Sequence, residues 1–160
     1  MVLERNLIAT DVPAASWREA AHLAGQLLVD AGKVSPAFPN DLIETVERFG
    51  PYMIIVPEVA FFHAPPSKDI YEACISFVTL ERTVRFEEFN NQPISCAFAF
   101  GAVDNDSHLA MLQDVARLLR DGSFVKLALS HASADELVDC AKRLTDGEDA
   151  VQDSDCSKNE

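Results

Sequence analysis

Residues 50–66 read GPYMIIVPEVAFFHAPP, and this stretch decides the fold. Residues 52–56 are a continuous apolar run, which is typical of a strand buried on both faces. Pro57 interrupts the run, and the apolar residues 59–62 resume it. Two prolines follow shortly and can continue neither a strand nor a helix, so we expect His63 at the lip of a loop.

The chain on either side of this stretch shows other apolar periods. Apolar residues spaced by three and four predict helices, and apolar runs predict strands. The helices are expected at residues 16–31, 39–49, 109–120, 123–129 and 133–144, and the strands at 74–80, 84–86 and 94–102. Ser16 and Glu19 form a capping box for the first helix, and Gly32 ends it. This order predicts an α/β fold: a single domain with a central mixed β-sheet flanked by helices on both faces.

Length and charge exclude several classes of protein. The chain has 160 residues, of which 48% are apolar and 24% charged, and this fits one globular domain. No run reaches the roughly 20 apolar residues that a membrane span needs, and residues 1–6 do not resemble a signal peptide. The net charge of −13 and the pI near 4.6 argue against nucleic acid or anionic lipid as partners. An acidic surface favours basic protein partners instead.

The acidic residues are concentrated near the end of the chain. Residues 146–160 hold six acidic side chains and a single lysine, without apolar periodicity. We therefore expect a folded domain over residues 1–145 and a disordered acidic tail over 146–160.

Known motifs for cofactors and metals are not found in the sequence. Four cysteines (Cys74, Cys96, Cys140 and Cys156) form no CxxC pair, and without a secretion signal they indicate a reduced, cytoplasmic setting. The four histidines are scattered, so we expect no metal site. Because phosphate-binding and dinucleotide-binding loops are also missing, we expect no organic cofactor.

Two histidines follow predicted strands. His63 comes directly after residues 59–62, and His108 opens the helix that follows residues 94–102. Ligand sites of open α/β sheets gather at the carboxyl ends of strands and at helix N-termini. A neutral imidazole can attack phosphorus, and a second imidazole with helix N–H groups can stabilise the transferred group. The pair predicts a phosphoryl site, and the alternative is that both histidines are ordinary loop residues.

Residues 50–66 resemble the active-site stretch of the IIA components of the bacterial sugar phosphotransferase system. The similarity is to the mannitol/fructose-type superfamily and, within it, to the ascorbate-type IIA proteins. It extends from about residue 7 to residue 144, with further matches at 15–20, 77–80, 90–94 and 102–108.

The resemblance implies a role for each histidine. His63 would accept a phosphoryl group from the histidine phosphocarrier protein and pass it to a cysteine of a IIB component, for uptake of an ascorbate-like sugar. His108 would stabilise the phosphoryl group, and Ser107 is placed by its position to add a donor. Neither the sugar nor a homodimer is decided by the sequence.

The chain departs from the family pattern close to His63. Glu58 stands where the family has glycine, Phe62 where it has proline, and Pro65 where it has arginine. We expect a carboxylate at position 58 to repel phosphate. Glu47 takes the place of an assisting arginine on the second helix, with Arg48 beside it. Two alternatives therefore stay open: a regulatory domain that reports its phosphorylation state, and a binding domain with impaired or lost transfer.

Overall fold

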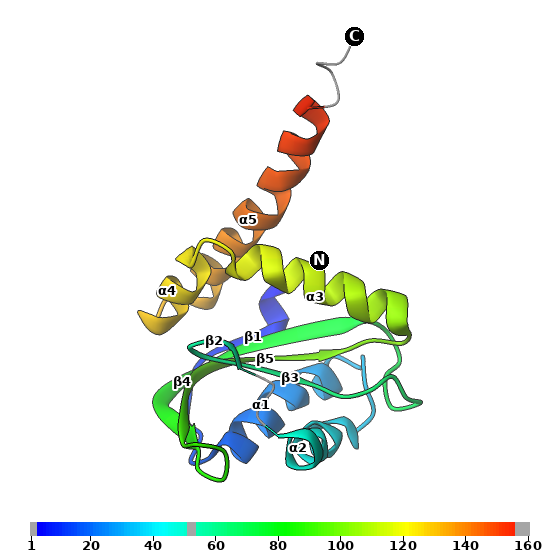
Figure 1. The fold of residues 1–160 in the computed structure, drawn as a ribbon, viewed down its shortest axis with the longest axis vertical. Helices are drawn as coiled ribbons and strands as arrows, with labels where there is room; N and C mark the ends of the chain where they lie inside the picture. Colours follow the sequence, from blue (N-terminus) through cyan, green and yellow to red (C-terminus); the bar gives the residue numbers. More distant parts are fainter. Residues whose placement is uncertain (1–2, 51–53, 156–160) are drawn as a thin grey trace.

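The computed structural model describes residues 3–50 and 54–155, and these residues form a five-stranded mixed sheet (Figure 1). The strands are β1 (Ile8–Val12), β2 (Ile54–Val56), β3 (Glu58–His63), β4 (Cys74–Phe86) and β5 (Gln92–Gly101). Their order across the sheet is β1-β4-β5-β3-β2. The pairs β1–β4 and β3–β5 are parallel, whereas β4–β5 and β2–β3 are antiparallel.

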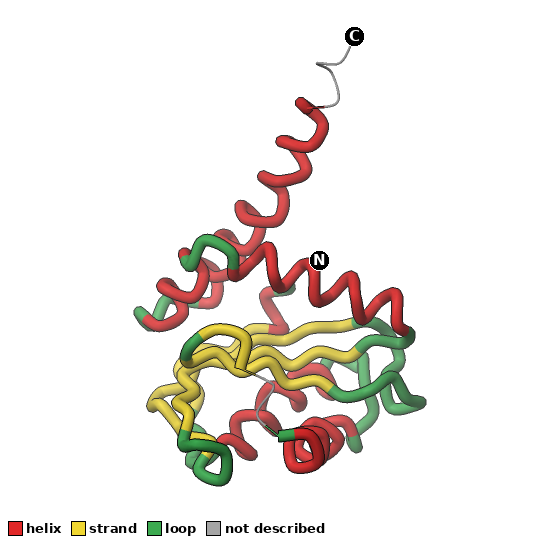
Figure 2. The backbone as a smooth tube through the Cα atoms, viewed as in Figure 1, coloured by secondary structure: helices red, strands yellow, loops and turns green. Residues whose placement is uncertain are grey.

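Helices cover both faces of this sheet, as Figures 1 and 2 show. On one face lie α1 (Trp17–Asp30) and α2 (Phe38–Phe49), and on the other lie α3 (Asn105–Leu119), α4 (Ser123–Leu129) and α5 (Ala134–Asp155). A short 3₁₀ helix, η1 (Arg5–Leu7), precedes β1. The architecture confirms the predicted α/β domain with a mixed sheet between two helical layers.

The two faces of the sheet hold separate apolar cores because successive side chains of a strand alternate in direction. Trp17, Phe62 and Phe86 are buried on the α1–α2 face. A second set is buried on the α3–α5 face and consists of Phe61, Phe77, Phe98, Phe100 and Phe124. Gly25 lets α1 and α2 approach closely, since a Cβ there would lie 3.1 Å from the backbone of Pro39.

Several predicted boundaries differ from the structure. Strand β1 was not expected, and the runs at 74–80 and 84–86 form one strand, β4. Of the predicted strand 52–56, residues 52 and 53 lie outside the described residues. His63 is the last residue of β3 and directly precedes a loop, as expected.

The C-terminal helix is longer than predicted. α5 continues to Asp155, since no proline interrupts residues 146–155. Its second half projects beyond the rest of the domain in Figure 1. Most of the segment expected as a disordered tail is thus helical here, and a separate acidic tail stays a prediction. Within the described ranges, none of the helices is both long and apolar enough to cross a membrane.

Candidate functional site

The two predicted site histidines lie together at one edge of the sheet. His63 ends β3 and is paired in register with Phe100 of the parallel strand β5. β5 leads through a short loop into α3, whose first turns carry His108. Because β3 and β5 run in the same direction, their carboxyl ends meet at this edge. The imidazole centroids of His63 and His108 are 5.7 Å apart, and the rings are inclined by 78°.

One ring nitrogen of His63 has a backbone partner. The Nδ1 atom lies 3.2 Å from the carbonyl oxygen of Phe61. A carbonyl oxygen only accepts hydrogen bonds, so Nδ1 carries the proton of the neutral ring and Nε2 keeps its lone pair. Of the two ring nitrogens of His63, Nε2 is therefore the nucleophilic one.

The surroundings of His63 favour its neutral form. The side chain is half-buried. Burial lowers the pKa of His63, the hydrogen bond to Phe61 partly opposes this, and the neighbouring His108 adds to the lowering. The pKa thus lies below the ordinary value of 6.5, and at neutral pH the Nε2 lone pair is available.

An aromatic side chain contacts both imidazoles. The Phe100 ring centroid lies 5.3 Å from that of His63 and 5.1 Å from that of His108. Phe100 also stacks on Phe61, with centroids 4.6 Å apart and an angle of 11°. Neither phenylalanine was predicted as a neighbour of the two histidines. The period of two in the strands, which puts residues 61 and 63 of β3 and residues 98 and 100 of β5 on one face, was the signal for their proximity.

His108 is held by the cap of α3. The Asp104 carboxylate accepts a hydrogen bond of 2.8 Å from the Ser107 backbone N–H, and the Ser107 hydroxyl accepts one of 3.2 Å from the Asp104 N–H. The bonds from the Ser107 backbone and side chain lower the pKa of Asp104. The Ser107 hydroxyl also donates to the Asp104 carbonyl at 3.1 Å. Ser107 therefore fixes the turn that carries His108, and its hydroxyl proton is already engaged.

Glu58 and Phe62 do not lie beside the His63 imidazole. Glu58 begins β3 and His63 ends it. Five steps of about 3.3 Å along the strand therefore separate their Cα atoms by roughly 16 Å. The Glu58 carboxylate accepts a hydrogen bond of 2.8 Å from the hydroxyl of Ser95. Phe62 points to the opposite face, where it is fully buried. The expected repulsion between Glu58 and a phosphoryl group on His63 does not follow from this geometry.

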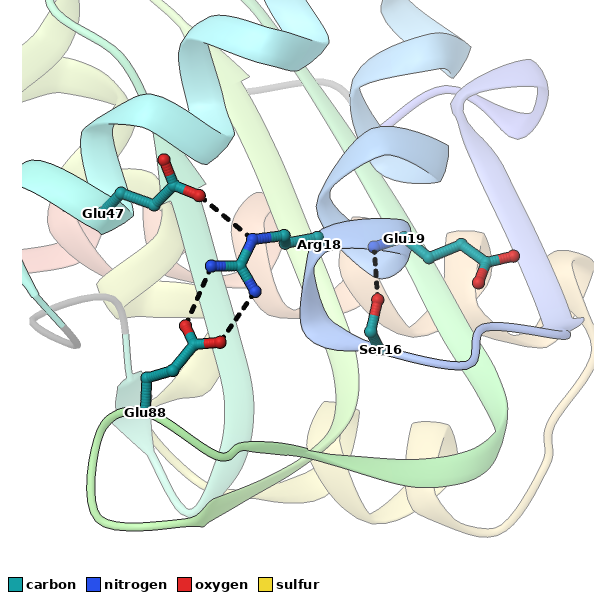
Figure 3. Close-up of polar contacts among 5 residues, drawn as sticks. All are labelled: Ser16, Arg18, Glu19, Glu47 and Glu88. Carbon is teal, nitrogen blue, oxygen red and sulfur yellow. Dashed lines mark hydrogen bonds and ion pairs between the residues drawn. The ribbon is translucent and has the colours of Figure 1, made fainter.

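Glu47 takes part in a different contact. Its carboxylate accepts a hydrogen bond of 3.0 Å from Nε of Arg18, whose terminal nitrogens bind both oxygens of Glu88 at 2.9 Å (Figure 3). This cluster joins the start of α1, the end of α2 and the turn between β4 and β5.

Arg48 lies on the α2 side of the sheet. It lines an open cleft of about 720 Å³ together with Ala64 and Pro65, the residues that follow His63. Ala64 belongs to the apolar core of the α1–α2 face, whereas the His63 ring packs with Phe61 and Phe100 of the α3 face. The cleft and the histidine pair thus lie on different sides of the β3 terminus.

The site offers imidazoles rather than a metal cage. No group of three or more histidine, cysteine, aspartate or glutamate side chains within the described part of the chain could hold a metal ion. Three cysteines are buried thiols, and burial raises the pKa of Cys74 to about 11 and of Cys96 to about 12.

Solved structures that match this architecture include IIA domains of phosphotransferase systems. The mannitol-specific cryptic phosphotransferase enzyme IIA of Escherichia coli is 28% identical, with a TM-score of 0.78 over 88% of this chain and 95% of that one. The fold also matches the Escherichia coli IIA domain solved in complex with phosphorylated enzyme IIB of the mannitol system. Its TM-score is 0.75 at 20% identity, over 87% of this chain and 96% of that one. The fold is thus that of the mannitol-type IIA domains.

The sequence family agrees with the fold. Residues 1–143 match the family described as "Phosphoenolpyruvate-dependent sugar phosphotransferase system, EIIA 2", and the chain belongs to this family. The ascorbate-specific EIIA component of Salmonella choleraesuis is 29% identical over 141 residues, which cover 88% of this chain and 92% of that protein. The Escherichia coli K12 protein of the same description is 30% identical over 119 residues, which cover 74% of this chain and 77% of that protein.

Proposed function

We propose that this protein relays a phosphoryl group through His63. It takes the group from the phosphohistidine of a phosphocarrier protein and passes it to a cysteine of a IIB component that serves uptake of an ascorbate-like sugar. The observation that carries the proposal is the half-buried His63, whose Nδ1 is bound to a backbone carbonyl while Nε2 is free and His108 lies alongside. The ascorbate-specific relatives support the sugar class, and the relay would operate in the cytoplasm.

The transfer balances without movement of a proton. The Nε2 lone pair of neutral His63 attacks phosphorus, a new N–P bond forms, and the N–P bond of the donor phosphohistidine breaks. The donor leaves as a neutral imidazole, and the His63 ring becomes a phosphorylated imidazolium that keeps its Nδ1 proton. Its hydrogen bond to the Phe61 carbonyl then becomes charge-assisted and stronger. In the second step a cysteine thiolate of the IIB component attacks phosphorus, and neutral His63 is restored.

His108 would act on the transferred group through hydrogen bonding. With centroids 5.7 Å apart, an oxygen of a phosphoryl group on Nε2 lies within reach of an N–H of the second ring. A donor placed where charge develops stabilises the transition state, because the site need not reorganise. Asp104 and Ser107 serve this role indirectly, since their mutual bonds hold the turn before His108.

The geometry favours relay over a binding domain that has lost transfer. Two of the departures that supported lost transfer, Glu58 and Phe62, are remote from the imidazole or face the opposite core. Pro65 lines the cleft on the α2 side. The two imidazoles themselves are retained and lie side by side.

The test is phosphorylation by the general enzymes of the phosphotransferase system with phosphoenolpyruvate, read by intact mass at neutral pH. We expect one acid-labile phosphoryl group on the wild type and none on His63→Gln. His22→Gln is the matched control, because His22 is exposed on α1 and lies outside the site. His108→Gln should accept the group more slowly, by about 10²-fold or more.

The outcomes separate the alternatives. A folded wild type that takes up no phosphoryl group would contradict relay and indicate a binding domain. A phosphorylated His63→Gln variant would place the acceptor elsewhere. Phosphorylation of His63 without onward transfer to a cognate IIB cysteine would indicate the regulatory role.

A further inference from the structure

Phe100 is the side chain that connects the two histidines. It is fully buried, and its ring contacts His63 and His108 at nearly equal centroid distances of 5.3 and 5.1 Å. The two contacts differ in angle, at 34° and 61°, so the ring is tilted against the His63 imidazole and meets the His108 imidazole closer to edge-on. We infer that Phe100 is a positioning residue that sets the orientation of both imidazoles.

The ring of Phe100 is itself held in place. Its stack on Phe61, at 4.6 Å and 11°, is the nearest to parallel of the ring contacts between described residues. The backbone carbonyl of the same Phe61 accepts the Nδ1 hydrogen bond of His63. Phe61 therefore fixes one ring nitrogen of His63 while Phe100 limits rotation of the imidazole plane. Together they decide which nitrogen of His63 is protonated and where the other one points.

A single aromatic contact can have this effect because the hydrogen bond between the His63 imidazole and the Phe61 carbonyl holds the orientation of the ring only weakly. The bond from Nδ1 to the Phe61 carbonyl is 3.2 Å long, at the long end of the usual range, and rotation about the outer side-chain torsion of histidine is broad. A flat neighbour restricts that torsion where an aliphatic side chain of similar size does not. Loss of the flat surface should let the ring turn over and the proton move between the two nitrogens.

Phe98 provides a matched control. It lies two residues earlier in β5, on the same face, and is equally buried. Its ring contacts are with Phe61, Phe77 and Phe124, and neither histidine is among them. Phe98→Leu and Phe100→Leu therefore remove the same atoms from the same core, and only the second removes the contact with the imidazoles.

The experiment measures the imidazole ¹⁵N chemical shifts and the side-chain couplings of His63 and His108 in the unphosphorylated protein above pH 7. In the wild type and in Phe98→Leu we expect a single tautomer of His63 with the proton on Nδ1, and one rotamer for each histidine. In Phe100→Leu we expect a mixture of tautomers and averaged couplings at both histidines, with thermal stability close to that of Phe98→Leu. If Phe100→Leu does not fold, Phe100→Met replaces it with a more adaptable side chain.

A second readout rests on the proposed function. Phosphorylation of His63 should be about tenfold or more slower in Phe100→Leu than in Phe98→Leu, because a misplaced nucleophile forfeits alignment. The tautomer measurement does not depend on transfer, so it decides the positioning role even if the wild type proves not to be a phosphoryl acceptor. A single tautomer and unaveraged couplings in Phe100→Leu, or equal disturbance in Phe98→Leu, would overturn the inference.

Discussion

Glu58, which stands where the family has glycine, has a strained backbone that can be tested by mutation. Its φ of 68° lies in the left-handed region, which costs a residue with a Cβ about 1–2 kcal/mol. Its carboxylate accepts one hydrogen bond from Ser95, worth about 1 kcal/mol. Glu58→Ala loses the hydrogen bond and keeps the backbone strain. Glu58→Gly loses the same bond and is relieved of the strain.

The expected order of stability is therefore the reverse of the order usual in strands. Glu58→Ala should lower the free energy of unfolding by about 1 kcal/mol. Glu58→Gly should lie close to the wild type and about 1 kcal/mol above the alanine variant. In a strand of ordinary backbone geometry, glycine is instead about 0.5–1 kcal/mol worse than alanine.

Urea unfolding followed by the fluorescence of Trp17, the only tryptophan and a buried one, measures these differences. The control is the pair Ser95→Ala and Ser95→Gly, at a residue without a positive φ. Both variants lose the hydrogen bond to Glu58 and the one between the hydroxyls of Ser95 and Thr83, so their difference reports the backbone alone. There alanine should be the more stable variant. If Glu58→Ala proves as stable as Glu58→Gly or more so, the strain argument is refuted. If Glu58→Gly speeds phosphorylation of His63, the argument that Glu58 lies too far from His63 to influence the transfer, at roughly 16 Å, is refuted as well.

The remaining predictions concern the protonation of His63 and the helix cap that precedes His108. The NMR titration of His63 should have its midpoint below pH 6.5, because burial lowers the pKa of this imidazole. Phosphoryl acceptance should persist below pH 6.5 until that midpoint is passed. A midpoint at or above pH 6.5 would contradict burial as the dominant effect on the pKa. As the pH falls, His63 binds a proton in the unfolded chain before it does so in the folded protein. Acidification through pH 6.5 should therefore lower the free energy of unfolding, and His63→Gln should lack this part of the pH dependence. Asp104→Ala should lower the stability in urea unfolding and slow phosphorylation, whereas Asp104→Asn, which caps a helix equally well, should do neither. Equal losses in both Asp104 variants would show that charge, and not the cap, holds the turn before His108.

The fold was predictable wherever the apolar period was strong. Ser16 caps α1 as expected, although the Glu19 carboxylate accepts its hydrogen bond from the backbone N–H of Ala15 and not from that of Ser16. The predicted limits of α4 agree with the structure. Strand β1 was missed because its five residues include Thr10 and Asp11, and its register with β4 is irregular there. Asp11 has a φ of 51°, which a period of two cannot reveal.

The proximity of His63 and His108 was predictable from the sequence, but the residues that surround them were not. Position at the ends of parallel strands was enough to bring His63 and His108 to one edge. Proximity in sequence to His63 was a poor guide to Glu58 and Phe62, because a strand moves about 3.3 Å per residue and alternates its faces. Phe100, which is 37 positions away in the chain, contacts the imidazole because it is the register partner of His63 in β5. Register depends on the pairing of distant segments, which residue spacing alone does not give.

The charge of the whole protein and the burial of His63 act in opposite directions on the protonation of this imidazole. A net charge of −13 attracts protons and would by itself favour the charged form of an exposed histidine. Burial is nevertheless the largest influence on the pKa of His63, and it favours the neutral form. The phenylalanines that pack on His63 shield it from water, while the acidic surface remains available to attract a basic partner. The aromatic surroundings of His63 therefore increase the share of this imidazole that is neutral at neutral pH, against the effect of the acidic surface.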